Sequence, residues 1–465
     1  MPLRVLLISL FHPELVRGGA QQVAYELFQE LREREDVACF LLASLDESYP
    51  ALFKSGARIT GFDGRADEYL FLSRNYDHWW HKLGEPLLIE SFIEFLQTIR
   101  PDVVHFHHFL TFGIDLISVV RRVLPSCRIV FTFHEFMAIC AANGHMVRRT
   151  DGSLCDHASQ VRCHQCFPDR PPEDFLLRKM WFMRHLAGVD RFTCPSRFMI
   201  EHYVTWGLAR DRMFHVANGQ RSYAEGSHTT MPARANDAAP KRRFGFFGQL
   251  HDTKGVHIVL RAVNLLRADG VTNFHVEING DNMRFASDAV RLEIEAFLAE
   301  EQKLAPSERL VTHNGSYNVD QLQQRMGRID WCIVPSTWWE AFALVISEAW
   351  MFGRPVICSN VGAMAERVTD EVDGLLFEMG DPGALAAVMR RACTEDGLWQ
   401  RLHDALPTPP SRASMADGYL RLYRDEVERS GFSPSLKGRG RSLPTDTSIA
   451  CSPPAGCPCR DAAAQ

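Results

Sequence analysis

The stretch from Asp330 to Gly353 constrains the fold of this chain most strongly. After Asp330 comes Trp-Cys-Ile-Val, an uninterrupted apolar run that is typical of a strand buried in a parallel sheet. Pro335-Ser336 ends the run, because proline cannot donate a hydrogen bond to a neighbouring strand. Apolar residues then recur at helical spacing from Leu344 until Gly353 ends the helix. A strand, a loop and a helix in this order predict an α/β fold.

Two carboxylates, Glu340 and Glu348, lie in this loop and helix. If both are counted as helical, they are about 80° apart around the axis and roughly 12 Å apart along it. They are then too far apart to share a metal or a proton, but they suit two ends of an extended ligand. Free N–H groups at the helix start favour an anion between them. This arrangement matches the sugar hydroxyls, diphosphate and ribose of a nucleotide sugar. The alternative, a solvated helix face, fits the apolar surroundings poorly.

The residues around the two glutamates resemble the signature of a known enzyme family. Glu340 and Glu348 are separated by seven residues, with Pro335-Ser336 before them and Gly353-Arg-Pro-Val-Ile after them. Two glutamates at this spacing are common in helices, but with these neighbours they resemble the motif of retaining glycosyltransferases of family 4. The resemblance implies the GT-B fold, in which two Rossmann-like parallel-sheet domains enclose a cleft.

The domain organisation follows from the resemblance and from composition. Residues 220–240 are rich in small residues and proline without periodicity, which predicts an interdomain linker. The other predicted parts are an N-terminal acceptor-side domain (1–219) containing a cysteine-rich loop (140–170), a C-terminal nucleotide-sugar-binding domain (241–410), a helix packing back on the first domain (411–430) and a disordered tail (431–465).

Length, charge and apolar runs exclude several classes of protein. The chain of 465 residues is long enough for two domains, and its net charge of −6 argues against a nucleic-acid partner. The apolar run at Leu3–His12 is short and predicts a strand rather than a signal peptide. No stretch has 18 uninterrupted apolar residues, so we expect no membrane span. The 13 cysteines, mostly scattered in apolar runs, fit reduced thiols in a cytoplasmic protein.

Two features of the first half point to a ligand site. Gly18-Gly19 stands between a strand and a helix, where glycine lets the backbone approach a phosphate or sugar, although a tight turn explains it as well. His134 ends an apolar strand, and open α/β sheets bind ligands at strand ends. The resemblance assigns Gly19 to a donor-binding loop and places His134 beside the donor sugar or acceptor. His105, His107 and His108 follow another strand and are expected to be packing residues.

The loop from Gly248 to Gly255 resembles the family's second phosphate site. Lys254 stands at the loop–helix junction, where its ammonium can lie beside a diphosphate. Gln249 occupies the position where the family has an arginine, so one positive charge is missing. A weaker phosphate site, a different donor or a lost activity are all consistent with this substitution, although glutamine can still donate a hydrogen bond.

Cysteines cluster between residues 140 and 166. Cys140, Cys155, Cys163 and Cys166 can supply four thiolates to a structural zinc ion. Their spacing is irregular, and reduced thiols fit the sequence equally well; a disulfide is a third alternative.

The segment that begins at Phe175 predicts an apolar and basic helix. Such a helix can lie on a bilayer and give peripheral membrane contact, or it can bury its apolar face in the core, which is the simpler expectation.

The resemblance implies a retaining hexosyltransferase that uses a UDP- or GDP-linked sugar and a glycan or lipid-linked acceptor, with no cofactor needed for catalysis. Cell-surface polysaccharide or glycolipid assembly is the implied context, and no oligomeric state is implied. Glu348 is expected at the ribose, Glu340 at the donor sugar and His134 at the reacting groups. The diphosphate is assigned to Lys254 and to the amides of Ala341, Phe342, Ala343 and Leu344. A nucleotide-sugar epimerase, a binding-only pseudoenzyme and a scaffold are the alternatives.

Overall fold

The computed structural model describes residues 1–49, 56–221 and 241–426. The predicted tail (431–465) and all but the first two residues of the predicted linker (220–240) lie outside these ranges.

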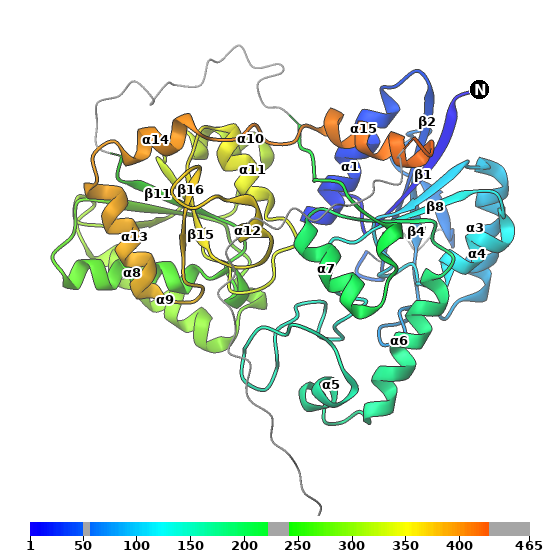
Figure 1. The fold of residues 1–465 in the computed structure, drawn as a ribbon, viewed down its shortest axis with the longest axis horizontal. Helices are drawn as coiled ribbons and strands as arrows, with labels where there is room; N and C mark the ends of the chain where they lie inside the picture. Colours follow the sequence, from blue (N-terminus) through cyan, green and yellow to red (C-terminus); the bar gives the residue numbers. More distant parts are fainter. Residues whose placement is uncertain (50–55, 222–240, 427–465) are drawn as a thin grey trace, which may run out of the picture. The chain divides into compact units, whose positions relative to one another are not determined.

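The first half of the chain builds an eight-stranded sheet in the order β10-β9-β8-β7-β1-β2-β4-β3 (Figure 1). Its neighbouring strands pair in parallel except at the edge, where β3 runs antiparallel to β4. A separate two-stranded hairpin joins β5 to β6. The strands are β1 (Leu3–Ser9), β2 (Val37–Leu45), β3 (Ile59–Gly61), β4 (Glu68–Leu72), β5 (Tyr76–Asp77), β6 (Lys82–Leu83), β7 (Val103–Phe106), β8 (Arg128–Thr132), β9 (Arg191–Cys194) and β10 (Met213–His215).

Helices alternate with these strands and cover the sheet. They are α1 (Gly19–Arg32), α3 (Pro86–Ile99), α4 (Leu116–Val123), α5 (Gln160–Cys166), α6 (Pro172–Leu186) and α7 (Arg197–Trp206). The core between them is rich in phenylalanine, and Phe92 of α3 packs edge to face against Phe71 of β4. The central strands are apolar on both faces because helices lie on both sides of a parallel sheet.

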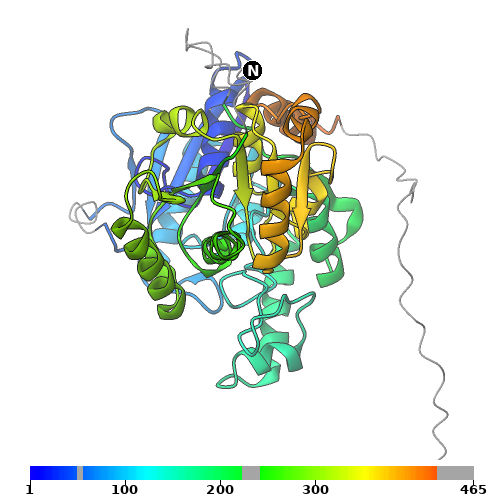
Figure 2. The same cartoon turned by 90° about the vertical axis from the view of Figure 1, so that its left-hand side faces the viewer.

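The second half builds a six-stranded sheet, entirely parallel, in the order β13-β12-β11-β14-β15-β16. Figure 2 shows this sheet with its helices from the side. The strands are β11 (Arg243–Phe247), β12 (His275–Asn279), β13 (Val311–His313), β14 (Trp331–Val334), β15 (Val356–Ser359) and β16 (Gly374–Phe377). The helices are α8 (Val256–Ala268), α9 (Asp288–Lys303), α10 (Val319–Met326), α11 (Leu344–Met351), α12 (Gly362–Arg367), α13 (Pro382–Thr394) and α14 (Leu398–Asp404). Two parallel sheets flanked by helices confirm the predicted α/β class.

The last described helix, α15 (Arg412–Tyr423), contacts the first half of the chain. The Tyr423 hydroxyl lies 2.6 Å from His105 Nδ1, and Arg412 Nε lies 3.1 Å from a carboxylate oxygen of Glu30 in α1. Just before α15, the backbone of Gln220 exchanges hydrogen bonds with Pro410 and Arg412. The end of the first half at Gln220 therefore lies beside the segment that leads into α15.

Candidate active site

A cleft of about 550 Å³ lies where loops from both halves meet. Its wall includes His134 after β8, Gln249 after β11 and Pro335 after β14. These loops all follow the carboxyl ends of parallel strands, which is where open α/β sheets bind ligands. The cleft brings together most of the residues predicted from the sequence: Gly19, His134, Gln249, Lys254, Glu340, Ala341, Phe342, Ala343 and Leu344.

Lys254 and Glu340 form an ion pair in the wall of this cleft. Lys254 Nζ donates to Glu340 Oε1 over 2.6 Å, and the Ser336 hydroxyl donates to the same oxygen over 2.7 Å. Burial acts to raise the pKa of Glu340, but Lys254, Ser336 and Trp338 outweigh it and lower that pKa. Glu340 is therefore ionised at neutral pH and can accept hydrogen bonds from sugar hydroxyls.

Glu348 has a different environment from Glu340. It lies on α11 and is not among the residues that line the cleft. Gln220 Nε2 donates to its carboxylate over 3.2 Å, and burial raises its pKa to about 7. The structure thus places the two predicted carboxylates on one loop-and-helix segment and gives them opposite pKa shifts.

The helix that carries Glu348 begins at Leu344, as the spacing of apolar residues predicts, and not at Ala341, the first of the four amides assigned to the diphosphate. Ala343 has a positive φ of 56° and precedes the first helical residue, Leu344. Ala341 and Phe342 therefore belong to the preceding loop, although they line the cleft. The Arg367 guanidinium holds this loop by donating to the carbonyl oxygens of Phe342 and Ala343 over 2.8 and 3.0 Å. Arg367 was not predicted as a site residue, because it lies in α12, after the segment that contains the two glutamates.

Close backbone contacts explain a glycine of the predicted phosphate loop. Gly255 has φ +73°, and a Cβ atom there would lie 1.9 Å from the carbonyl oxygen of Pro335. Only glycine fits such a contact with the loop after β14. This contact places Lys254 beside the loop that carries Glu340.

His134 is a neutral side chain in the cleft wall. Its Nε2 lies 3.0 Å from Nδ1 of His107, and burial lowers its pKa to about 4. His105 and His108 are also buried, which agrees with their predicted packing role. His105 lies within β7, whereas His107 and His108 lie in the loop after it. His107 contacts His134.

Three side chains in the cleft wall were not predicted as site residues: Glu135, His145 and His251. Glu135 adjoins His134 in sequence, and that adjacency was its only signal. Trp338 and Trp339 also line the cleft. The ring of Trp338 lies 5.3 Å from that of His145, and Trp339 packs against Phe198. His145 belongs to the cysteine-rich loop, so its approach to Trp338 depends on long-range packing.

The zinc hypothesis is not supported. The four cysteines line a small cavity of about 30 Å³. However, no three His, Cys, Asp or Glu side chains in the described ranges are arranged to hold a metal ion. Burial raises the pKa of Cys163 to about 11, which keeps this thiol protonated at neutral pH. The described cysteines are free thiols.

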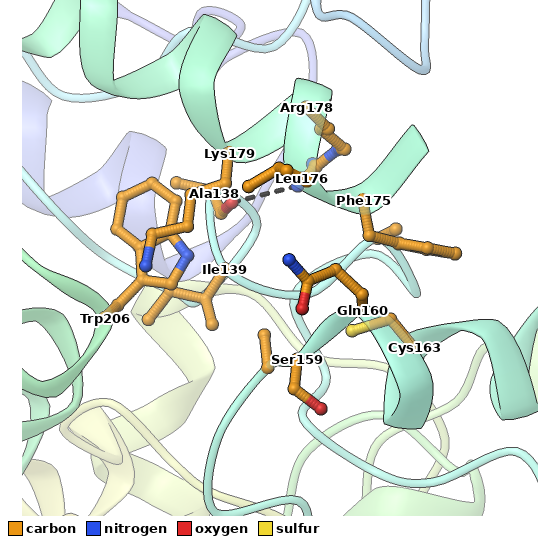
Figure 3. Close-up of a pocket in the computed structure, with 12 residues that line it drawn as sticks. Ala138, Ile139, Ser159, Gln160, Cys163, Phe175, Leu176, Arg178, Lys179 and Trp206 are labelled. Atoms are coloured by element: carbon orange, nitrogen blue, oxygen red, sulfur yellow. Dashed lines mark hydrogen bonds between the residues drawn. The ribbon is translucent and has the colours of Figure 1, made fainter. Parts of the chain in front are cut away.

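A third cavity, of about 190 Å³, lies between α5, α6 and α7 (Figure 3). Arg178 beside it is buried and donates to the carbonyl oxygen of Ala138 over 2.9 Å. Leu176 and Lys179 of α6 also line it. No helix in the described part of the chain is long and apolar enough to cross a bilayer.

Comparisons with known proteins match both halves of the chain. The model described as Glycosyltransferase Family 4 matches residues 17–220, and the model described as Glycosyl transferases group 1 matches residues 241–395. The chain is a glycosyltransferase of the GT-B type. The two matches correspond to the two halves that enclose the cleft.

Curated relatives of this GT-B protein are distant in sequence. A glycogen synthase of Mycobacterium tuberculosis is 26% identical over 409 residues, covering 86% of this chain and 88% of that protein. The putative colanic acid biosynthesis glycosyl transferase WcaC of Escherichia coli is 23% identical and covers 77% and 84%. An uncharacterized 41.2 kDa protein in the cps region of Klebsiella pneumoniae is 23% identical, over 38% of this chain and 45% of that protein.

Solved structures share the fold of this GT-B protein. Anabaena Alr3699/HepE in complex with UDP and glucose aligns with a TM-score of 0.60 and 16% identity, covering 91% of this chain and 100% of that one. At this identity the similarity establishes the fold alone. It confirms the predicted GT-B architecture.

Proposed function

We propose that this GT-B protein transfers a sugar from a UDP- or GDP-linked donor to a hydroxyl group of a glycan or lipid-linked acceptor, with retention of anomeric configuration. The main observation in support is the ion pair of Lys254 and Glu340 in the cleft, next to the start of α11. A cation beside free helical amides favours a diphosphate, and an ionised carboxylate next to it accepts sugar hydroxyls. The names of WcaC and HepE support a polysaccharide context and a UDP-linked donor.

Each half of the chain has a role in this proposal. Residues 1–219 carry the acceptor side and 241–410 the donor side, with His134 facing the reacting groups. The diphosphate contacts Lys254 and the backbone from Ala341 to Leu344, and Glu340 contacts the donor sugar. The ribose hydroxyls reach Glu348, displacing the Gln220 amide that now bonds to it. The leaving phosphate takes the proton of the acceptor hydroxyl, so no protein nucleophile takes part.

Activity with UDP-glucose and GDP-mannose tests this function. We expect nucleotide release, and an α-linked product by NMR when a hydroxyl acceptor is supplied. Lys254→Ala should slow turnover by about 100-fold, because it removes a cation placed for the developing charge on the phosphate. Lys303→Ala, which removes an exposed cation on α9, is the matched control and should leave the rate unchanged.

Three other outcomes contradict this proposal. An inverted, β-linked product excludes retention. Release of a changed nucleotide sugar without an acceptor favours the epimerase. Nucleotide binding without turnover favours the pseudoenzyme, for which Gln249 in the cleft wall is the supporting observation.

We also propose that this protein contacts an anionic bilayer through α5 and α6. Val161, Leu176, Leu177 and Met180 are 63%, 42%, 50% and 59% exposed, and on α6 they share a face with the cations Lys179 and Arg184. Neither cation forms an ion pair among the described residues, although Lys179 Nζ lies 5.9 Å from the centre of the Trp206 ring. An apolar helix face bordered by cations without acidic partners suits the surface of an anionic membrane.

Vesicle flotation tests this contact. Wild-type protein should float with vesicles of phosphatidylcholine and phosphatidylglycerol, and less with phosphatidylcholine alone. Replacing Leu177 and Met180 with serine should abolish flotation, whereas Leu265→Ser, a similarly exposed leucine on α8, should not. Equal flotation of both variants would contradict the contact.

A further inference from the structure

Glu135 is a carboxylate of the cleft wall that the roles above leave unused. It follows His134 at the carboxyl end of β8, in the half of the chain assigned to the acceptor. Its side chain is 24% exposed, so it reaches the cleft rather than the core. Glu340 is its counterpart in the opposite half. The cleft thus presents one carboxylate from each half.

One hydrogen bond and one close contact fix the position of Glu135. The backbone N–H of Met137 donates to Oε2, and Nε2 of His108 lies 3.3 Å from Oε1. The N–H of Leu110 donates to His108 Nδ1 over 2.8 Å, so Nδ1 carries the lone pair and Nε2 carries the proton. His108 therefore presents a protonated ring nitrogen next to Glu135. Burial lowers the pKa of His108 to about 3, so this partner is uncharged.

The backbone also makes room for this carboxylate. Gly144 has φ +73°, and a Cβ atom there would lie 2.6 Å from Glu135 Oε2. Gly144 and the next residue, His145, both line the cleft. The cysteine-rich loop therefore closes around Glu135 without covering it.

The carboxylate keeps unused capacity to accept hydrogen bonds. Each carboxylate oxygen can accept about two hydrogen bonds, and within the described residues Glu135 accepts one, from Met137 at Oε2. No arginine or lysine forms an ion pair with Glu135 in the part of the chain that the structure describes. Hydroxyl groups are the donors that suit such an oxygen in a solvent-accessible cleft.

We propose that Glu135, held by His108 and Met137, binds the attacking hydroxyl group of the acceptor and orients it toward the donor sugar. The ligand class is a polyhydroxylated acceptor, with water taking the same place when no acceptor is bound. This inference rests on the proposed transferase function. It adds Glu135 as a second site residue of the acceptor half, where the proposed function names only His134.

Hydrolysis of the nucleotide sugar tests the inference without knowledge of the acceptor. The probes are UDP-glucose and GDP-mannose, with water as the attacking hydroxyl, and nucleotide affinity is measured by calorimetry on the same samples. Burial raises the pKa of Glu135 to about 7, so hydrolysis is measured at about pH 8.5, where this group is ionised. Glu135→Gln keeps an oxygen for Met137 but cannot ionise. We expect hydrolysis to fall at least tenfold while the Kd for the nucleotide stays within twofold.

Two further variants complete the test. Glu135→Asp keeps the charge but withdraws it by one methylene, and it should also slow hydrolysis. Glu85→Gln, at a partly exposed carboxylate paired with Arg58 outside the cleft, is the control and should change neither quantity. Wild-type hydrolysis in Glu135→Gln, or equal loss of nucleotide affinity and hydrolysis, overturns the inference. Absence of turnover by the wild-type protein instead overturns the proposed function on which the inference rests.

Discussion

At the scale of single residues, the environment decides how two identical side chains behave. Glu340 is paired with Lys254, and its pKa is lowered, whereas burial raises the pKa of Glu348 from its usual 4.5 to about 7. The glutamate spacing predicted that both belong to one site. It could not predict their charge, because Lys254 and Gln220 are distant in sequence and approach only in the fold.

This difference predicts a pH dependence of stability. A native pKa of about 7 for Glu348 means that the native state binds more protons than the unfolded state between about pH 4.5 and 7. The contribution of Glu348 to stability is therefore present at low pH and is lost as the pH rises through this window. Glu348→Gln, which is always neutral, should be more stable than wild type at pH 8 by about 1–3 kcal/mol.

Urea denaturation at pH 4.5 and pH 8 checks this prediction. The gain in Glu348→Gln should vanish at the lower pH, where Glu348 is protonated in the native state. Glu293→Gln serves as a control, because Arg261 lowers the pKa of Glu293 and its replacement should destabilise at pH 8. An equal gain at both pH values would show that Glu348 is not the titrating group.

At the scale of elements, apolar runs predicted the main strands and helices well. The helix predicted at Phe175 belongs to α6, and the strand predicted before Pro335 is β14. The start of α11 at Leu344 agrees with the predicted spacing, but the positive φ of Ala343 before it was not predictable, because alanine does not signal this conformation. The outer strand β3 is only three residues long and leaves too short a pattern to recognise.

The contact between Gly255 and Pro335 predicts that one methyl group added at Gly255 strongly lowers the stability of the fold. Gly255→Ala places a Cβ atom 1.9 Å from a backbone oxygen, and its φ of +73° adds strain. We expect a loss of about 2–4 kcal/mol in the free energy of unfolding. Gly270→Ala is the matched control, with φ +75° and no atom within 4 Å, and should cost about 1 kcal/mol. Equal losses in thermal or urea unfolding would contradict the contact.

At the scale of the whole molecule, the cleft depends on both halves of the chain. The loops at the carboxyl ends of the strands follow from the α/β pattern, but the return of α15 to the first half was predicted from family resemblance alone. The contact of Tyr423 with His105 joins residues 318 positions apart, for which the sequence shows no pattern. The zinc hypothesis failed for a related reason, because clustering in sequence did not bring the four thiols into a metal-holding arrangement.

The central claim is that this cleft binds the nucleotide of a sugar donor through the segment that carries both glutamates. Calorimetric titration of the wild-type protein with UDP, GDP and ADP tests it most directly, with Glu348→Ala as the variant and Glu293→Ala as the control. We predict saturable binding of one nucleotide by the wild type and the control, and at least tenfold weaker binding by Glu348→Ala. Absence of binding at millimolar nucleotide, or equal affinity of all three proteins, would contradict the assignment of the donor site.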